Sequence, residues 1–168
     1  AWNLEEGLEK YRLPGHKARI TTVAISHDDV FAASGGLDKI IRVWNIPMKS
    51  FAFQLEGHAQ EVSCLSFSPT GQFLASGSAD RVVRLWDMET KSLHITCREH
   101  TEEVTSLSWF HDGRRLISGG GDGQVNIWHM DESHHHWSLR MRSVRDSLRR
   151  GDLRVAIQLN WRAKFLPL

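Results

Sequence analysis

The chain has 168 residues, of which 40% are hydrophobic and 24% charged, a composition typical of a globular domain with a sizeable core. Its two cysteines, Cys64 and Cys97, form no Cys-x-x-Cys pattern, which argues against a disulfide framework and favours a reducing compartment. No apolar run approaches the roughly 18 residues of a membrane span, so we expect no transmembrane segment. Neither an initiator Met nor a signal-peptide pattern is present, and we interpret the chain as a fragment or short isoform.

The net charge of +1 hides an uneven distribution. Residues 138–168 carry eight basic and two acidic side chains, a charge of +6, whereas the remainder carries −5. This asymmetry predicts a basic tail on a mildly acidic body. Such a tail could bind nucleic acid, an anionic membrane or an acidic partner. The candidate anion-binding residues in the tail are Arg140, Arg142, Arg145, Arg149, Arg150 and Arg154.

A period of 42 residues organises the rest of the chain. Four residue types recur three times at this spacing without a gap, which predicts a repeated structural unit that buries its faces against its neighbours. The recurring residues are His16, His58 and His100; Ser34, Ser76 and Ser118; Asp38, Asp80 and Asp122; and Trp44, Trp86 and Trp128.

The first 14 residues continue this period backwards. Trp2 precedes Trp44 by 42 residues, and each is followed by Asn. Residues 7–13 then occupy the place of a fourth strand. We therefore expect residues 1–14 to be the end of a preceding unit whose first two strands lie outside the chain.

Each of the three full units, 15–56, 57–98 and 99–140, predicts four strands. Alternating apolar residues indicate first strands at 20–26, 62–68 and 104–110. Turn residues follow, and a second strand ends in small residues that let neighbouring sheets approach closely. Third strands carry the Trp, at 40–44, 82–86 and 124–128, and fourth strands are expected at 50–55, 92–97 and 137–140.

The period, Gly57-His58 and Trp86-Asp87 make residues 1–140 resemble the WD40-repeat family of β-propellers. Three positions depart from the family pattern: Glu99, Asn45 and His129. The resemblance implies an all-β fold, a WD40-like β-propeller with three full four-stranded blades and an N-terminal half-blade in an incomplete ring. A basic C-terminal extension follows.

The period stops after residue 140, so residues 141–168 form a basic non-repeat tail. Met141, Val144 and Leu148 have helical spacing, and residues 153–162 alternate like a strand. An incomplete ring leaves sheet faces to be covered. Three alternatives for covering these sheet faces remain: the tail itself, a second chain, or blades outside this chain.

The recurring Ser, His and Asp also match the side chains of a hydrolase triad. The resemblance implies instead a structural hydrogen-bond chain, in which Trp86 donates to Ser76, Ser76 to His58, and His58 to Asp80. A scaffold explains three copies beside a Trp and an active site does not, so we expect no enzyme and no catalytic residue. Burial of all three serines would exclude the hydrolase alternative.

Partner binding is expected on loops, because the resemblance implies that one face gathers those before the first strand and between the second and third. Their mixed charge favours a peptide or protein partner of mixed charge. The candidate residues are Lys17, Arg19, Thr21 and Leu37; Gln60, Glu61, Ser63 and Ala79; and Glu102, Glu103, Thr105 and Gly121.

We expect neither a cofactor nor a metal. His134, His135 and His136 are consecutive, and neighbours on a strand point to opposite faces, so an exposed hairpin is the better interpretation. The expected function is a scaffold or adaptor of a multiprotein complex. The alternative is a nucleic-acid-associated protein of chromatin, transcription or RNA processing that uses its basic tail. An intracellular location is expected, either nuclear or cytoplasmic.

Overall fold

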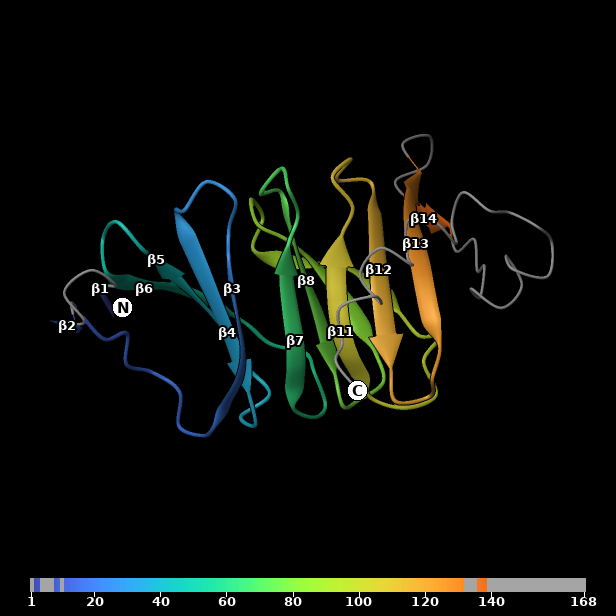
Figure 1. Cartoon of the computed structure of the whole chain (residues 1–168), viewed down its shortest axis with the longest axis horizontal. Helices are drawn as coiled ribbons and strands as arrows, with labels where there is room; N and C mark the ends of the chain where they lie inside the picture. Colours follow the sequence, from blue (N-terminus) through green and yellow to red (C-terminus); the bar gives the residue numbers. More distant parts are fainter. Residues whose placement is uncertain (1, 4–7, 10, 132–135, 139–168) are drawn as a thin grey trace, which may run out of the picture.

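Three four-stranded antiparallel sheets stand side by side in the computed structural model, preceded by a short two-stranded pair (Figure 1). The structure describes residues 2–3, 8–9, 11–131 and 136–138, and these form strands and turns without a helix. No helix in this described part could therefore cross a membrane. The all-β prediction is confirmed.

Each sheet is a meander of four sequential strands. The first contains β3 (Ile20–Ile25), β4 (Phe31–Gly36), β5 (Ile41–Asn45) and β6 (Ser50–Leu55). The second contains β7 (Val62–Phe67), β8 (Phe73–Ser78), β9 (Val83–Asp87) and β10 (Ser92–Cys97). The third contains β11 (Val104–Trp109), β12 (Arg115–Gly120), β13 (Val125–Asp131) and β14 (His136–Ser138).

The N-terminal pair has the strand register of the outer hairpin of a full sheet. Its strands are β1 (Trp2–Asn3) and β2 (Leu8–Glu9), and Trp2 lies opposite Glu9. Trp44 lies opposite Phe51 in the first full sheet, the same seven-residue separation. The shared register fits the predicted half-blade, in which β1 and β2 would be a third and a fourth strand.

The outer hairpin of the third sheet differs from the prediction. β13 extends to Asp131, which pairs with His136, so β14 begins one residue before the expected 137–140 strand. His134, His135, residues 139–140 and the whole 141–168 tail, with its predicted helix and strand, lie outside the described residues.

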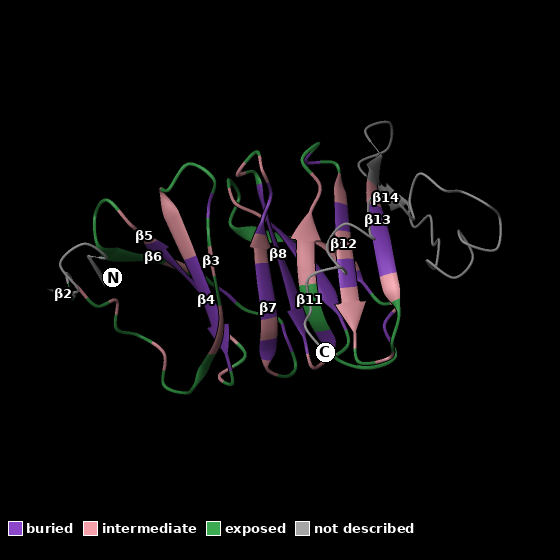
Figure 2. Cartoon of the chain, viewed as in Figure 1, coloured by how far each residue is buried: buried purple, intermediate pink, exposed green. Residues whose placement is uncertain are grey.

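Two apolar layers hold the three sheets together. Between the first and second sheets, buried residues such as Ile41 and Val43 pack against Leu65, Phe67 and Trp86. A matching layer lies between the second and third sheets, and each large aliphatic side chain that is fully buried in it contributes about 1.5–3 kcal/mol. Because the middle sheet is covered on both faces, β8 is buried along its whole length (Figure 2).

Among the described residues, no such layer covers the outward face of the first sheet. Val23 and Ile25 on β3 are 71% and 61% exposed, whereas their counterparts Leu65 and Phe67 on β7 are 8% and 9% exposed. The ring formed by the described residues is therefore open at this side (Figure 1).

Candidate functional site

Trp, Ser, His and Asp form one hydrogen-bond chain in each full sheet. The indole Nε1 donates to the serine Oγ at 2.9, 2.8 and 2.9 Å in the three sheets. The same Oγ lies 2.8, 2.7 and 2.8 Å from the histidine Nε2. The histidine Nδ1 reaches the aspartate carboxylate at 2.9, 2.9 and 3.0 Å. The chain ties the third strand, the second strand and the entry loop of each sheet together.

The serines in these chains are not available as nucleophiles. Ser34, Ser76 and Ser118 are 6%, 0% and 1% exposed, and each hydroxyl already contacts an indole and an imidazole. A hydrolytic triad needs a serine that a substrate can reach. The hydrolase interpretation of these residues therefore does not hold.

An arginine that the sequence reasoning missed joins two of the three chains. Arg42 Nη1 lies 2.6 Å from Asp38 Oδ2, and Arg84 Nη1 lies 2.8 Å from Asp80 Oδ2. At the corresponding place in the third sheet stands Asn126, whose Nδ2 lies 3.3 Å from His100 Nε2. The 42-residue register carried the signal, because it places a basic residue in two third strands that are otherwise apolar.

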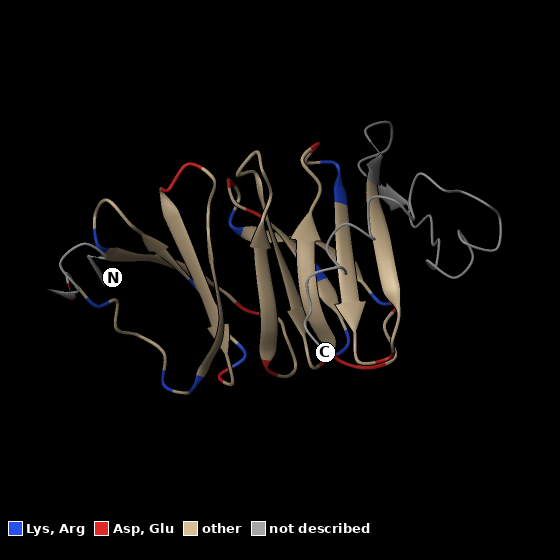
Figure 3. Cartoon of the chain, viewed as in Figure 1, with Lys and Arg blue, Asp and Glu red and all other residues tan. Residues whose placement is uncertain are grey.

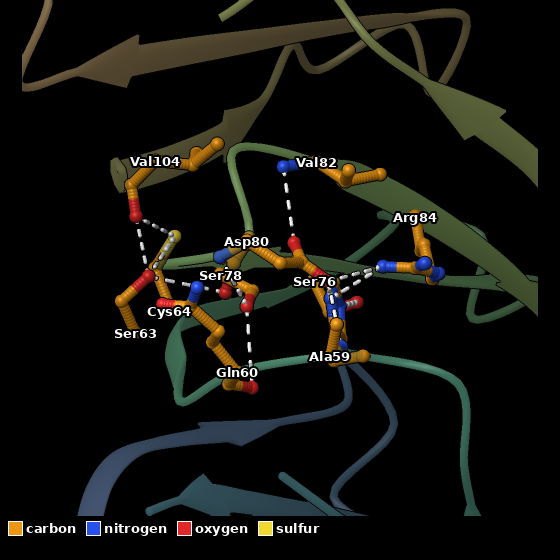
Figure 4. A network of polar contacts seen from close by, with 12 residues as sticks. Ala59, Gln60, Ser63, Cys64, Ser76, Ser78, Asp80, Val82, Arg84 and Val104 are labelled. Carbon is orange, nitrogen blue, oxygen red and sulfur yellow. Dashed lines mark hydrogen bonds and ion pairs between the residues drawn. The ribbon is translucent and has the colours of Figure 1, made fainter. Parts of the chain in front are cut away.

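In the second sheet, burial and hydrogen-bond partners together set the charge states of His58 and Asp80. Burial alone would raise the pKa of Asp80, but hydrogen bonds from the Ala59 amide, His58 and Arg84 bring it down to about 2 (Figure 4). Burial lowers the pKa of His58, and Arg84 adds to that lowering while Asp80 opposes it. His58 is therefore neutral and Asp80 ionised at neutral pH. The imidazole then donates from Nδ1 to Asp80 and accepts at Nε2 from Ser76.

The two thiols are buried packing residues. Burial raises the pKa of Cys64 to about 11 and that of Cys97 to about 12. Neither is a thiolate at neutral pH, so neither is an activated nucleophile. Within the described ranges, no group of three His, Cys, Asp or Glu side chains could hold a metal ion.

The predicted partner loops meet at one edge of the sheets, the lower edge in Figure 1, which we call the loop edge. In every sheet, a backbone bond joins the loop before the first strand to the loop between the second and third. The Leu37 amide donates to Arg19 O at 3.0 Å, Ala79 to Glu61 O at 3.0 Å, and Gly121 to Glu103 O at 2.8 Å. Eight of the twelve predicted residues are exposed there, namely Lys17, Arg19, Leu37, Gln60, Glu102, Glu103, Thr105 and Gly121.

Charge is unequally distributed along the loop edge (Figure 3). The loops of the first sheet carry exposed Lys17 and Arg19, and those of the third carry exposed Glu102 and Glu103. Glu61, under the second sheet, is half-buried. The edge therefore runs from positive to negative across three sheets.

Two of the predicted loop residues serve the contact between sheets. Thr21 and Ser63 each occupy a bulge in the first strand, where the pairing register shifts by one residue. The Thr21 hydroxyl donates to Val62 O of the next sheet at 2.5 Å, and Ser63 donates to Val104 O (Figure 4). Alternation in the sequence does not reveal a bulge, so the sequence reasoning had no signal for this role.

Repeated four-stranded meanders, joined face to face and each tied by a Trp-Ser-His-Asp chain, define blades of a β-propeller. The family model described as WD domain, G-beta repeat matches residues 7–45, 49–87 and 91–129, which is more than half of the chain. The chain belongs to this WD40-repeat family, whose repeats generally mediate protein–protein interactions in complexes. A comparison with curated proteins gave no match.

The matched segments and the sheets are out of phase. The segment 49–87 begins at β6, the outer strand of the first sheet, and ends at β9 of the second. One sequence repeat therefore spans two sheets.

Proposed function

We propose that this chain is an interaction scaffold, an adaptor that holds a peptide or protein partner on its loop edge within a multiprotein complex. The supporting observation is the backbone bond between paired loops, repeated at the same place in all three sheets. Loops fixed in this way present exposed side chains at set positions on a rigid frame. Such preorganisation lowers the entropy cost of binding.

The proposed partner has mixed charge. Acidic groups would face Lys17 and Arg19, and basic groups would face Glu102 and Glu103. Arg81, exposed in the β8–β9 loop, adds a cation to the second sheet, so the contrast is greatest between the first and third sheets.

A peptide array tests this proposal. Peptides of one composition but different charge order are probed with the wild-type chain and with Glu102→Lys plus Glu103→Lys. We expect peptides with an acidic half and a basic half to bind. Each Glu→Lys charge reversal in the protein should cost about 1 kcal/mol of binding free energy, roughly fivefold in affinity. Glu89→Lys, exposed in the loop between β9 and β10, is the matched control. Equal losses from Glu89→Lys, or no loss from the double variant, would refute a site at the loop edge.

The proposal includes no enzymatic activity and an intracellular location, nuclear or cytoplasmic. Buried, reduced cysteines support a reducing compartment.

A second candidate function is nucleic-acid association through the tail, favoured by the charge of +6 over residues 138–168. A salt titration with single-stranded and duplex DNA separates the two proposals. DNA affinity of the wild type that falls steeply with added salt would support binding through the tail, provided that the steep salt dependence is lost when Arg145, Arg149 and Arg150 are replaced by Gln. Binding with a shallow salt slope, unchanged by those substitutions, would count against it.

A further inference from the structure

The two contacts between neighbouring sheets share one local device. Val62, at the start of β7, packs on Gly35 of the first sheet, where an added Cβ would lie 2.7 Å from Val62 Cγ1. Val104, at the start of β11, packs on Gly77 of the second sheet in the same way, at 2.6 Å. Both valines are fully buried. A branched side chain therefore fits against a glycine that has no room for a side chain of its own.

Within the part of the chain that the structure describes, one valine-type position and one glycine position of this device have no counterpart to pack against. Ile20 occupies the place of Val62 and Val104 in the first sheet, and its side chain is 47% exposed. Gly119 occupies the place of Gly35 and Gly77 in the third sheet. Among the described residues, the only atom within 4 Å of a Cβ at Gly119 is Ser106 Oγ, at 3.1 Å and from the same sheet.

The bulge hydroxyls show the same pattern. Thr21 donates to Val62 O and Ser63 donates to Val104 O, each reaching the first strand of the following sheet. Thr105 is the third member and is exposed. Within the described part of the chain, its hydroxyl bonds to Gly119 O of its own sheet at 3.1 Å. By the repeat, the acceptor in a following sheet would be the carbonyl oxygen that corresponds to Ile20.

Further exposed apolar side chains lie on the same strand as Ile20. Val23 and Ile25 lie on the same strand as Ile20 and are 71% and 61% exposed. Their counterparts in the second sheet, Leu65 and Phe67, are buried against the first. The first sheet thus presents the face that the second sheet buries and that the third sheet buries in part.

We propose that two copies of this chain associate head to tail, with the third sheet of one copy packing on the first sheet of the other, in the place that the predicted N-terminal half-blade would otherwise occupy. Ile20 of one copy would lie over Gly119 of its partner, and the partner's Thr105 would donate to the Ile20 carbonyl. A second copy is the occupant because this chain carries both halves of a contact that it already makes twice. The interface is heterologous, so repeated pairing gives either a closed ring or an open chain of copies.

Light scattering after size exclusion of the full 168-residue chain is the first test. We expect a mass above that of one chain that rises with protein concentration. Ile20→Asp places a carboxylate in the apolar contact, and Gly119→Phe fills the space that Ile20 would enter. Each should weaken association at least tenfold, whereas Met48→Asp, on the β5–β6 hairpin and 77% exposed in the wild type, should not.

Mixing the two defective variants is the decisive test. Ile20→Asp retains an intact Gly119 face, and Gly119→Phe retains an intact Ile20 face, so an equimolar mixture should recover a two-chain species. Circular dichroism must show wild-type spectra for both, and Gly119→Val replaces Gly119→Phe if the latter fails to fold. A symmetric contact between two first sheets would give no recovery. A wild type that is monomeric at every concentration would mean that another part of the chain, or nothing, covers this face; either result overturns the proposal.

Discussion

Replacing His58 by Ala should destabilise the chain, because this imidazole is the central link of the most enclosed hydrogen-bond chain. His58 is 7% exposed and sits in the middle sheet, which is packed on both faces. Its Nε2 lies 2.7 Å from Ser76 Oγ and its Nδ1 lies 2.9 Å from Asp80. The substitution removes both bonds at once.

The expected cost follows from what each partner keeps. Asp80 still accepts from the Ala59 amide at 2.9 Å and from Arg84 at 2.8 Å, so its charge remains compensated. Ser76 still accepts from Trp86, but its own buried O–H loses its acceptor, which costs about 1–3 kcal/mol. Loss of the ring volume adds about 1–2 kcal/mol. The sum of about 2–5 kcal/mol is a large part of the typical stability of a domain.

Urea denaturation followed by circular dichroism measures this cost, with thermal unfolding as a second readout. His27→Ala is the matched control, since His27 is exposed in the turn between β3 and β4. We expect the His58→Ala midpoint to fall well below that of the control with a similar denaturant slope. If the two variants differ by less than about 0.5 kcal/mol, the range of ordinary surface substitutions, the reasoning about a buried chain is wrong.

Three further predictions concern the unfolding free energy at acid pH, the contacts between sheets and the reactivity of the thiols. The pKa of Asp80 is about 2 when folded against an ordinary 3.8, so its stabilising effect is complete above pH 4 and is lost as pH falls toward 2; the unfolding free energies of wild type and Asp80→Asn should converge over that range in urea titrations. Gly77→Ala should cost about 1–3 kcal/mol, because its Cβ would lie 2.6 Å from Val104 and Cys64 atoms, whereas Gly119→Ala should cost less than about 1 kcal/mol in the single chain; equal costs in denaturation of the dilute, unassociated chain would contradict the described packing. Cys64 and Cys97 should react with Ellman's reagent at pH 8 only at the rate of unfolding, and rapid labelling of the native chain would show that they are accessible.

The repeat itself could be predicted from the sequence because its signals are local. Strand alternation, turn residues and the spacing of His58, Ser76, Asp80 and Trp86 all lie within one unit. The Trp2 register extended the same logic to a half-blade, and β1 and β2 pair in the register that this prediction requires. The loop-edge residues were implied by the resemblance to the WD40-repeat family, and the backbone bonds between those loops show how the loops are held together.

Interactions between units depended on the tertiary structure. Val23 and Leu65 are aliphatic residues at the same place in the same strand pattern, yet one is 71% exposed and the other 8%. The difference is the presence of a neighbouring sheet, which local sequence does not encode. For the same reason, the bulged Thr21 and Ser63 looked like loop side chains until the next sheet supplied their acceptors. The sequence by itself determined the fold of each blade, because hydrogen bonding and alternation act within a sheet. Only the tertiary structure decided which faces are satisfied and which are left open, because burial is a property of two surfaces in contact.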